Sequence, residues 1–290
     1  MEQYHVAVLK KEILDLVNPQ KDESYLDLTA GYGGHASMVM QITTNYQSSF
    51  LIDRDPTAFE YLKQKYKDRA VHLMNLDFLS ASQQLQNQQK KFDIILADLG
   101  MSSQHINDPK RGFSFLSNSS LDMRMDSNQE LNAFKVVNNY SQQSLQKILK
   151  DYGEEPKAVL IASLIIKNRP IYSTHDLALI CQKAWPGYHK IHPATRTFQA
   201  IRIEVNDELN QLQLSLPIWF ELLNSAGRLA IITFHSLEDR IVKRFFKEIA
   251  GPYLDSQATL INKKPVIVNQ QELVNNPRSR SAKLRVVLKK

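Results

Sequence analysis

The first 100 residues alternate short apolar runs with longer amphipathic segments, and this alternation restricts the fold more than any other feature. The apolar runs have the length of strands: "SYLDLTA", "SSFLIDRD", "AVHLMNLDF" and "FDIILADLG". Between them lie segments with helical spacing of apolar residues, one from about His35 and the others reading "PTAFEYLKQKY" and "LSASQQLQNQQKK". Short apolar strands separated by helices are typical of a parallel sheet covered on both faces. The sequence therefore predicts a doubly wound α/β domain.

The alternation stops after Gly100 and resumes near residue 207. From there a long helix, predicted over "DELNQLQLSLPIWFELL", leads through Gly227 into the strand "RLAIITF". The intervening residues are polar, with helix-like stretches such as "SQQSLQKILKDYG" and "THDLALICQKAW". A segment of about 100 residues is too long for an ordinary connection. We therefore expect an inserted helical domain over residues 105–206, between a first part of the α/β domain at 1–104 and a second part at 207–290.

A glycine-rich turn follows the first predicted strand, in "LDLTAGYGGHASMV". Gly31, Gly33 and Gly34 let a ligand approach the backbone at the carboxyl end of the strand, where doubly wound sheets bind ligands. Asp53 ends the second predicted strand about twenty residues later, where a carboxylate can accept hydrogen bonds from both ribose hydroxyls. These features predict a ligand that contains adenosine. The structural alternative is that the glycines only form a tight turn and Asp53 only caps the helix opening at Pro56.

The residues of this turn favour S-adenosylmethionine over a dinucleotide. Gly31, Gly33 and Ala36 formally satisfy the pattern G-x-G-x-x-A, so an NAD-dependent oxidoreductase is an alternative hypothesis. However, Asp27, two residues before the end of the predicted strand, places a negative charge near the turn. A carboxylate there disfavours a pyrophosphate and suits the cationic amino and sulfonium groups of S-adenosylmethionine.

Two further predicted strand ends agree with this donor. Asp77 and Phe78 are expected to end the third strand, where an acid and an aromatic ring can hold adenine by hydrogen bonding and stacking. Asp98 ends the fourth strand, beside the position expected for methyl transfer. The sequence thus predicts donor contacts from successive strands of one sheet.

The net charge and the cysteine content limit the possible binding partners and the cellular compartment. The formal net charge of +6 and the pI near 9.2 point to a polyanionic partner. The last sixteen residues carry six Lys or Arg and no acid, which indicates either a solvated terminal strand with a basic face or a nucleic-acid contact. Cys181 is the only cysteine, and there is neither a signal peptide nor an apolar run of about 18 residues, so we expect a cytoplasmic protein without a membrane partner. The histidines show no H-E-x-x-H or H-x-E zinc spacing, so no metal is expected.

A series of motifs resembles those of the bacterial 16S ribosomal RNA cytosine-N4 methyltransferases. They occur in order from His5 to Arg285: "LDLTAGYGGH", "IDRDPTAF", "ADLGMSS", "RGFSF", "LDMRMD", "YGEE", "HPATRTFQAIRIEVNDEL", "GRLAIITFHSLEDRIVKRFF" and "NPRSRSAKLRV". The resemblance implies a class I methyltransferase domain with a helical insert for substrate recognition. It also implies S-adenosylmethionine as donor and a cytidine of the small-subunit decoding region as acceptor, in 16S ribosomal RNA or the small ribosomal subunit.

The resemblance also implies site residues. Donor contacts carry over to Gly33, Gly34, His35, Asp53 at the ribose, Phe78 beside adenine and Asp98 near the transferred methyl. His105 stands where a donor-binding glutamine is usual, and Gln104 stands where proline is usual. A histidine can still donate or accept a hydrogen bond there. Pro156 in "YGEEPK" replaces a usual arginine, which removes one cation.

Asp98 is the predicted catalytic residue. An exocyclic cytosine amine is a poor nucleophile because its lone pair is delocalised into the ring, so methyl transfer needs an acceptor that holds the amine hydrogens. Asp98 can bond either the target amine or the amino group of the donor, and the sequence leaves both roles open. Positioning of the reactants can supply about 7 to 11 kcal/mol, so no strong general base is required.

Two segments of the insert contain candidate RNA contacts. Arg111, Phe113 and Phe115 lie in "RGFSF", where either phenylalanine can stack on a flipped base or pack inside the protein. The second segment, "KIHPATRTFQAIR", combines cations with an aromatic ring. Proteins that bind single-stranded RNA use the same combination, because cations contact phosphates and aromatic rings stack on bases. Its candidate RNA contacts are His192, Arg196 and Phe198, and the alternative is that Arg196, Phe198 and Arg202 pin the insert to the α/β domain.

His235 and Ser236 are expected to end the fifth strand near the active site, and Glu238 to open the next helix. His235 is then either a substrate contact or a structural residue, and no neighbouring nucleophile supports a hydrolytic triad. The leading hypothesis is an RNA cytosine-N4 methyltransferase. The alternatives are the NAD-dependent oxidoreductase and a non-catalytic RNA-binding assembly factor that keeps the fold.

Overall fold

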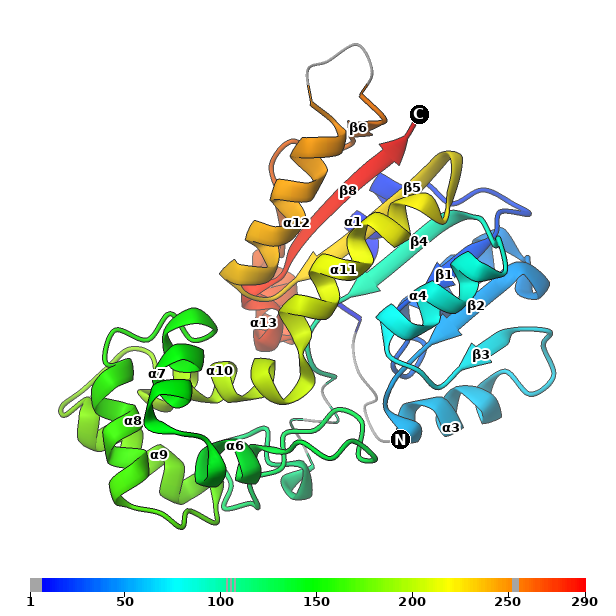
Figure 1. Cartoon of the computed structure of the whole chain (residues 1–290). Coiled ribbons are helices and arrows are strands. Elements are labelled where there is room, and N and C mark those ends of the chain that lie inside the picture. Colours follow the sequence, from blue (N-terminus) through cyan, green and yellow to red (C-terminus); the bar gives the residue numbers. More distant parts are fainter. Residues whose placement is uncertain (1–6, 103, 105, 107, 252–255) are drawn as a thin grey trace. The chain divides into compact units, whose positions relative to one another are not determined.

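The computed structural model describes residues 7–102, 104, 106, 108–251 and 256–290. The chain forms two compact units (Figure 1). Met1–Gly100 and Leu209–Lys290 make up the first, and Met101–Glu208 make up the second. Each unit has its own buried hydrophobic residues.

The first unit is built on one mixed sheet. Its strand order is β3-β2-β1-β4-β5-β8-β6, and β7 also pairs with β8. Strands β1 to β5 are parallel to their neighbours, whereas β8 is antiparallel to β5, β6 and β7. The strands are β1 (Tyr25–Asp27), β2 (Ser49–Ile52), β3 (His72–Met74), β4 (Phe92–Asp98), β5 (Leu223–Thr233), β6 (Ala258–Leu260), β7 (Val266–Ile267) and β8 (Lys283–Lys289).

Helices cover both faces of this sheet, which explains the near-continuous apolar strands. One face packs on α1 (Lys10–Val17), α2 (Gly34–Thr43) and α3 (Pro56–Lys65). The other face packs on α4 (Phe78–Asn87), α11 (Glu208–Glu221) and α12 (Ser236–Ile249). A short helix, α13 (Gln270–Asn275), and the turns η1 (Tyr46–Ser48) and η3 (Pro277–Ser281) complete the described elements of this first unit. The prediction of a doubly wound α/β fold is confirmed.

The register brings the carboxyl ends of the central strands to one edge of the sheet. Asp27 of β1 pairs with Leu96 of β4, and Asp98 pairs with Ile232 of β5. The turn after β1, the end of β4 and the start of α12 therefore lie at the same edge. This is the edge at which doubly wound sheets hold their ligands.

The second unit is helical. It contains η2 (Pro109–Arg111), α6 (Ala133–Asn139), α7 (Gln142–Asp151), α8 (Ala158–Lys167), α9 (Thr174–Ala184) and α10 (Ala194–Asn206). Side chains at the N-caps of several helices accept a backbone N–H, among them those of Asn132, Ser141 and Ser173. No helix within the described residues of either unit is long and apolar enough to cross a membrane.

Some predicted boundaries are wrong. Strand β3 ends at Met74, so Asp77 and Phe78 do not end it: Asp77 caps α4 and Phe78 is its first residue. Strand β5 starts at Leu223, before Gly227, and ends at Thr233, so His235 caps α12 and Ser236 begins it. Strands β3 and β5 each end where pairing with the neighbouring strand ends.

The C-terminal strand is also not a solvated strand. β8 pairs with β5 and also with β6 and β7, and four of its seven residues are buried. Its cations have partners inside the protein: Arg285 and Lys283 bond Asp239, and Lys289 Nζ donates to backbone carbonyls. These contacts remove Lys283, Arg285 and Lys289 from the candidates for nucleic-acid contact.

Candidate active site

The turn between β1 and α2 has a backbone that favours glycine. Gly31 and Gly33 have φ of 53° and 72°, in the left-handed region. A Cβ on Gly33 would lie 3.0 Å from Leu62 Cδ2 and from Lys65 Nζ. A Cβ on Gly34 would lie 3.0 Å from the Ala7 Cβ. Gly33 and Gly34 therefore leave little room for a side chain, whereas a Cβ on Gly31 would meet only the Thr29 carbonyl oxygen, at 4.0 Å.

Asp53 follows β2 directly and holds this turn. Its Oδ2 accepts the Gly31 N–H at 2.7 Å, and its Oδ1 accepts the Asp55 N–H at 2.8 Å. Asp55, rather than Asp53, caps α3, because its side chain accepts the Thr57 N–H. A carboxylate oxygen can accept more than one hydrogen bond, and a contact between Asp53 and ribose hydroxyls stays a prediction.

Asp98 and His35 meet at the end of β4. His35 Nε2 lies 3.4 Å from Asp98 Oδ2, with side chains 7% and 12% exposed. The Asp98 N–H donates to Thr29 Oγ1 at 2.6 Å. Within the described residues, Asp98 Oδ1 and both His35 nitrogens are buried without a hydrogen-bond partner. Buried polar atoms are nearly always paired, so these atoms mark the place where a polar ligand fits.

Asp27 lies beneath this pair and is 1% exposed. Its carboxylate accepts the Tyr25 hydroxyl at 2.8 Å and the Thr29 N–H at 3.1 Å. Burial raises the pKa of Asp27 to about 6, and the Asp98 charge adds to this rise, while His35 and the two hydrogen bonds oppose it. A carboxyl group with this pKa still carries negative charge at neutral pH, which favours a cationic ligand at the adjoining turn.

Phe78 lies in the first turn of α4. Its ring packs against Trp219 in an edge-on geometry, with centroids 5.4 Å apart, and the Trp219 indole N–H donates to Ser82 Oγ at 2.8 Å. The Asp77 carboxylate caps the same helix by accepting the Ser80 N–H. Phe78 is half-buried, so contact between its remaining surface and adenine stays a prediction.

Lys65 of α3 holds the glycine turn, and sequence reasoning missed it. Its Nζ donates to the carbonyl oxygens of Tyr32 and Gly33, each at 3.0 Å. Burial lowers the pKa of Lys65. A lysine on an amphipathic helix is ordinarily a solvated cation, so only the fold reveals this contact.

Comparison with known proteins decides the class of enzyme. The model of the MraW methylase family matches residues 2–290. The chain belongs to the MraW methylase family. The relatives named ribosomal RNA small subunit methyltransferase H include one from Clostridioides difficile (strain 630), 39% identical over all of both chains, and one from Fusobacterium nucleatum subsp. nucleatum, 41% identical over 98% of this chain and 96% of its own. A solved putative rRNA methylase from Clostridium thermocellum matches 98% of this chain and 99% of its own, at 11% identity and a TM-score of 0.48, too distant to support an argument.

As a MraW methylase, the protein is an enzyme that uses S-adenosylmethionine as its methyl donor. This finding removes the NAD-dependent oxidoreductase and the non-catalytic assembly factor from the hypotheses. The residues present fit the donor: Asp53 places a carboxylate beside the glycine turn, and Asp98 Oδ1 and the His35 nitrogens are buried without hydrogen-bond partners in the described chain. The individual contacts predicted for Gly33, Gly34, His35, Asp53, Phe78 and Asp98 stay predictions. His105 lies outside the described residues.

In the insert of this MraW methylase, the "RGFSF" residues have mainly structural contacts. The Arg111 guanidinium donates to the carbonyl oxygens of Arg124 and Met125 at 2.9 and 2.8 Å. Phe113 is 7% exposed in the core of the insert, so its ring is not free to stack on a base. Phe115 is half-buried and stacks on His192, with centroids 4.5 Å apart.

The second segment separates into buried and exposed side chains. Phe198 is 5% exposed and packs in the same core, which leaves no face for a base. His192 Nδ1 accepts the Ala194 N–H at 3.2 Å, and burial lowers the pKa of His192. Arg202 forms a two-bond ion pair with Glu208, both bonds 2.8 Å long. The Arg196 side chain is exposed and has no hydrogen bond or ion pair among the residues described, and its contact with RNA stays a prediction.

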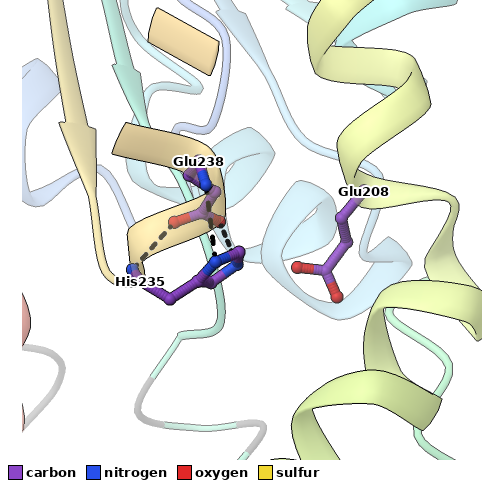
Figure 2. A group of neighbouring side chains, drawn as sticks. All are labelled: Glu208, His235 and Glu238. Atoms are coloured by element: carbon purple, nitrogen blue, oxygen red, sulfur yellow. Dashed lines mark hydrogen bonds and ion pairs between the residues drawn. The ribbon is translucent and has the colours of Figure 1, made fainter. Parts of the chain in front are cut away.

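His235 caps α12 (Figure 2). Its Nδ1 accepts the Glu238 N–H at 3.4 Å, Glu238 Oε2 accepts the His235 N–H at 3.3 Å, and Nε2 lies 3.1 Å from Oε1. This reciprocal capping uses Nδ1 and gives His235 a structural role, whereas Nε2 is buried without a hydrogen-bond partner among the described residues. A contact between His235 and substrate stays a prediction.

Proposed function

We propose that this MraW methylase transfers a methyl group from S-adenosylmethionine to the exocyclic N4 amine of a cytidine in the decoding region of 16S ribosomal RNA. The geometry that carries the proposal is the buried Asp98 Oδ1, which has no partner among the described residues at the ligand edge of the sheet. The relatives are named for methylation of small-subunit ribosomal RNA, which supports the choice of acceptor.

The residues of this chain divide into those that hold the donor and one that holds the acceptor amine. S-Adenosylmethionine supplies an electrophilic methyl group on its sulfonium. Asp53 fixes the glycine turn and accepts the ribose hydroxyls, and Asp27 favours positive charge beside that turn. Asp98 Oδ1 accepts a hydrogen from N4 and so aims the nitrogen lone pair at the methyl carbon. The N4–C bond forms as the S–C bond breaks, the sulfonium leaves as a neutral thioether, and N4 then releases one proton to water.

Positioning supplies most of the acceleration in this scheme. Holding two reactants in line contributes about 7 to 11 kcal/mol. The Asp98 side chain is 12% exposed, so its charge is only partly screened by water and orients the amine strongly. His35 at 3.4 Å limits the rotation of the carboxylate.

The deciding experiment is transfer of labelled methyl from S-adenosylmethionine to small ribosomal subunits from a strain that lacks this protein. The nucleosides are then separated, and label is expected in N4-methylcytidine from the decoding region. Subunits from the parent strain are the control, since their target is already methylated. Label in another nucleoside, or none, would contradict the proposed acceptor.

A further inference from the structure

Helix α12 carries a stripe of cations that the active site does not use. Arg240, Lys243, Arg244 and Lys247 are all exposed, and their spacing of three and four residues places them on one face of the helix. We call these four residues the basic stripe. The opposite face packs into the sheet core through Val242 and Phe246. At a rise of about 1.5 Å per residue, the basic stripe is roughly 10 Å long.

Two of the three acids of α12 are engaged inside the protein, and the third, Glu248, is exposed beside Lys247, so the four cations of the stripe and this one acid leave a net charge of +3. Glu238 is 2% exposed and is engaged by the cap with His235. Asp239 bonds Arg285 and Lys283 of β8, which hold its pKa below the usual range against an opposing effect of burial. Lys283 and Arg285 of the C-terminal strand therefore pair with Asp239 inside the protein, whereas the cations of α12 face solvent.

Three members of the stripe lack partners of their own. Within the described part of the chain, Lys243, Arg244 and Lys247 have no hydrogen bond or ion pair. Like charges three and four residues apart on a helix destabilise it slightly. A polyanion on this face relieves that repulsion, whereas a neutral or cationic partner does not.

The stripe begins at the edge of the sheet that holds the donor site. Asp98 pairs with Ile232 at the end of β5, and α12 follows that strand after a short turn. From there, α12 runs back alongside β5 and β8 (Figure 1). An RNA strand that leaves the active site along this helix with its bases stacked places about three phosphates over the length of the stripe, at a rise of about 3.4 Å per nucleotide.

We propose that the basic stripe of α12 binds the phosphate backbone of the substrate RNA beside the target nucleotide. This inference rests on the proposed RNA substrate. The contacts are to phosphates, so they contribute affinity and position the RNA without reading its sequence.

The test removes three charges from the stripe and compares the loss with a matched control. The stripe variant is Lys243→Ala/Arg244→Ala/Lys247→Ala, and alanine at exposed helical positions preserves the helix. The control is Lys10→Ala/Lys11→Ala/Lys21→Ala, which removes the same charge from exposed residues on and after α1, over the other face of the sheet. A charge-preserving variant, Lys243→Arg/Lys247→Arg, separates charge from side-chain packing.

Binding is measured against salt with the full chain and two probes: unmethylated small ribosomal subunits and a labelled single-stranded RNA of unrelated sequence. Each lost phosphate contact lowers the slope of log K against log salt by about 0.7. We expect the stripe variant to lose about 2 in slope on the single-stranded RNA, and its Kd to rise about tenfold or more at low salt on both probes. The control, the charge-preserving variant and S-adenosylmethionine affinity should stay at wild-type values.

Two results would overturn the inference: a stripe variant that matches the control in slope and Kd, or a charge-preserving variant that binds as weakly as the stripe variant. Failure of the proposed function has a different signature. If the wild type forms no N4-methylcytidine, the slope on the unrelated RNA still decides whether the stripe binds phosphate.

Discussion

His35 Nε2 lies 3.4 Å from Asp98 Oδ2, and this contact joins the first turn of α2 to the end of β4. The other oxygen of the same carboxylate, Oδ1, is buried without a partner among the described residues. Leaving such a group unpaired costs about 1 to 3 kcal/mol. The chain holds Asp98 from one side and leaves the other side for a ligand that donates hydrogens.

Replacing Asp98 tests whether this carboxylate holds the acceptor amine. We expect Asp98→Ala to abolish methyl transfer and Asp98→Asn to lower kcat by about 100-fold or more, since each removes charge aimed at the reacting nitrogen. The hydrogen bond from the Asp98 N–H to Thr29 Oγ1 uses the backbone, so the fold should survive. Single-turnover rates and calorimetric donor binding separate the two open roles: a loss confined to donor affinity assigns Asp98 to the donor's amino group. Near wild-type turnover would contradict both.

Asp53→Ala should weaken donor binding. The substitution removes two hydrogen bonds that the carboxylate accepts, from Gly31 and Asp55, as well as the expected bonds to ribose. Hydrogen bonds to charged groups contribute about 1.5 to 3 kcal/mol each, so the Kd for S-adenosylmethionine should rise at least tenfold. Asp55→Ala is the comparison, because it removes the cap of α3 and spares the carboxylate at the turn. Equal donor affinities for the two variants would argue against a ribose contact.

Gly33→Ala should destabilise the first unit. An alanine there has to adopt φ near 72° and places its Cβ 3.0 Å from Leu62 Cδ2. The left-handed conformation alone costs about 1 to 2 kcal/mol, and we expect a total loss of roughly 2 to 3 kcal/mol. Gly187→Ala measures the cost of the left-handed backbone without a close contact, because φ is 93° and nothing lies within 4 Å of a Cβ at this position. Urea unfolding of both variants measures the difference, and equal losses would remove the contact from the explanation.

The sequence predicted elements that depend on local pattern. Asp98 was correctly placed because a continuous apolar run, "FDIILAD", is buried on both faces and ends at the first acid that reaches the ligand edge. Phe78 and His235 were misplaced because pairing, rather than composition, ends β3 and β5. β3 pairs with β2 alone and stops at Met74, so the residues after it are free to start a helix.

Contacts between distant segments could not be predicted from sequence. Lys65 reaches the carbonyl of Gly33, and Arg285 reaches Asp239, and neither pair has a signature in the spacing of residues. The basic run at the C-terminus illustrates the consequence. Charge counting suggested a surface for nucleic acid, but insertion of β8 between β5 and β6 turned several of these cations into internal partners.

Asp27 should make stability depend on pH in an unusual direction. Burial raises the pKa of Asp27 in the folded state to about 6, above the ordinary aspartate pKa of about 4, so the folded state binds a proton more tightly than the unfolded state. Its contribution is therefore present below about pH 4 and is lost as the pH rises through 6, by roughly 3 kcal/mol. Asp27→Asn lacks this loss. Between pH 4 and 7, the free energy of unfolding of the variant should therefore rise relative to that of the wild type. Asp93→Asn is the opposite case, because hydrogen bonds from Ser24 and Asn224 and the charge of Arg228 outweigh burial and lower the pKa of Asp93.

Arg196→Ala should weaken RNA binding without destabilising the insert. Arg196 is exposed on α10 and has no ion pair among the described residues, whereas Arg202 on the same helix is held by Glu208. Loss of one phosphate contact should lower the salt slope of RNA binding by about 0.7 and leave urea unfolding unchanged. Arg202→Ala should do the reverse, because it leaves the Glu208 carboxylate, only 9% exposed, without its partner. An unchanged salt slope for Arg196→Ala, together with a loss of stability, would show that Arg196 supports the insert and does not contact RNA.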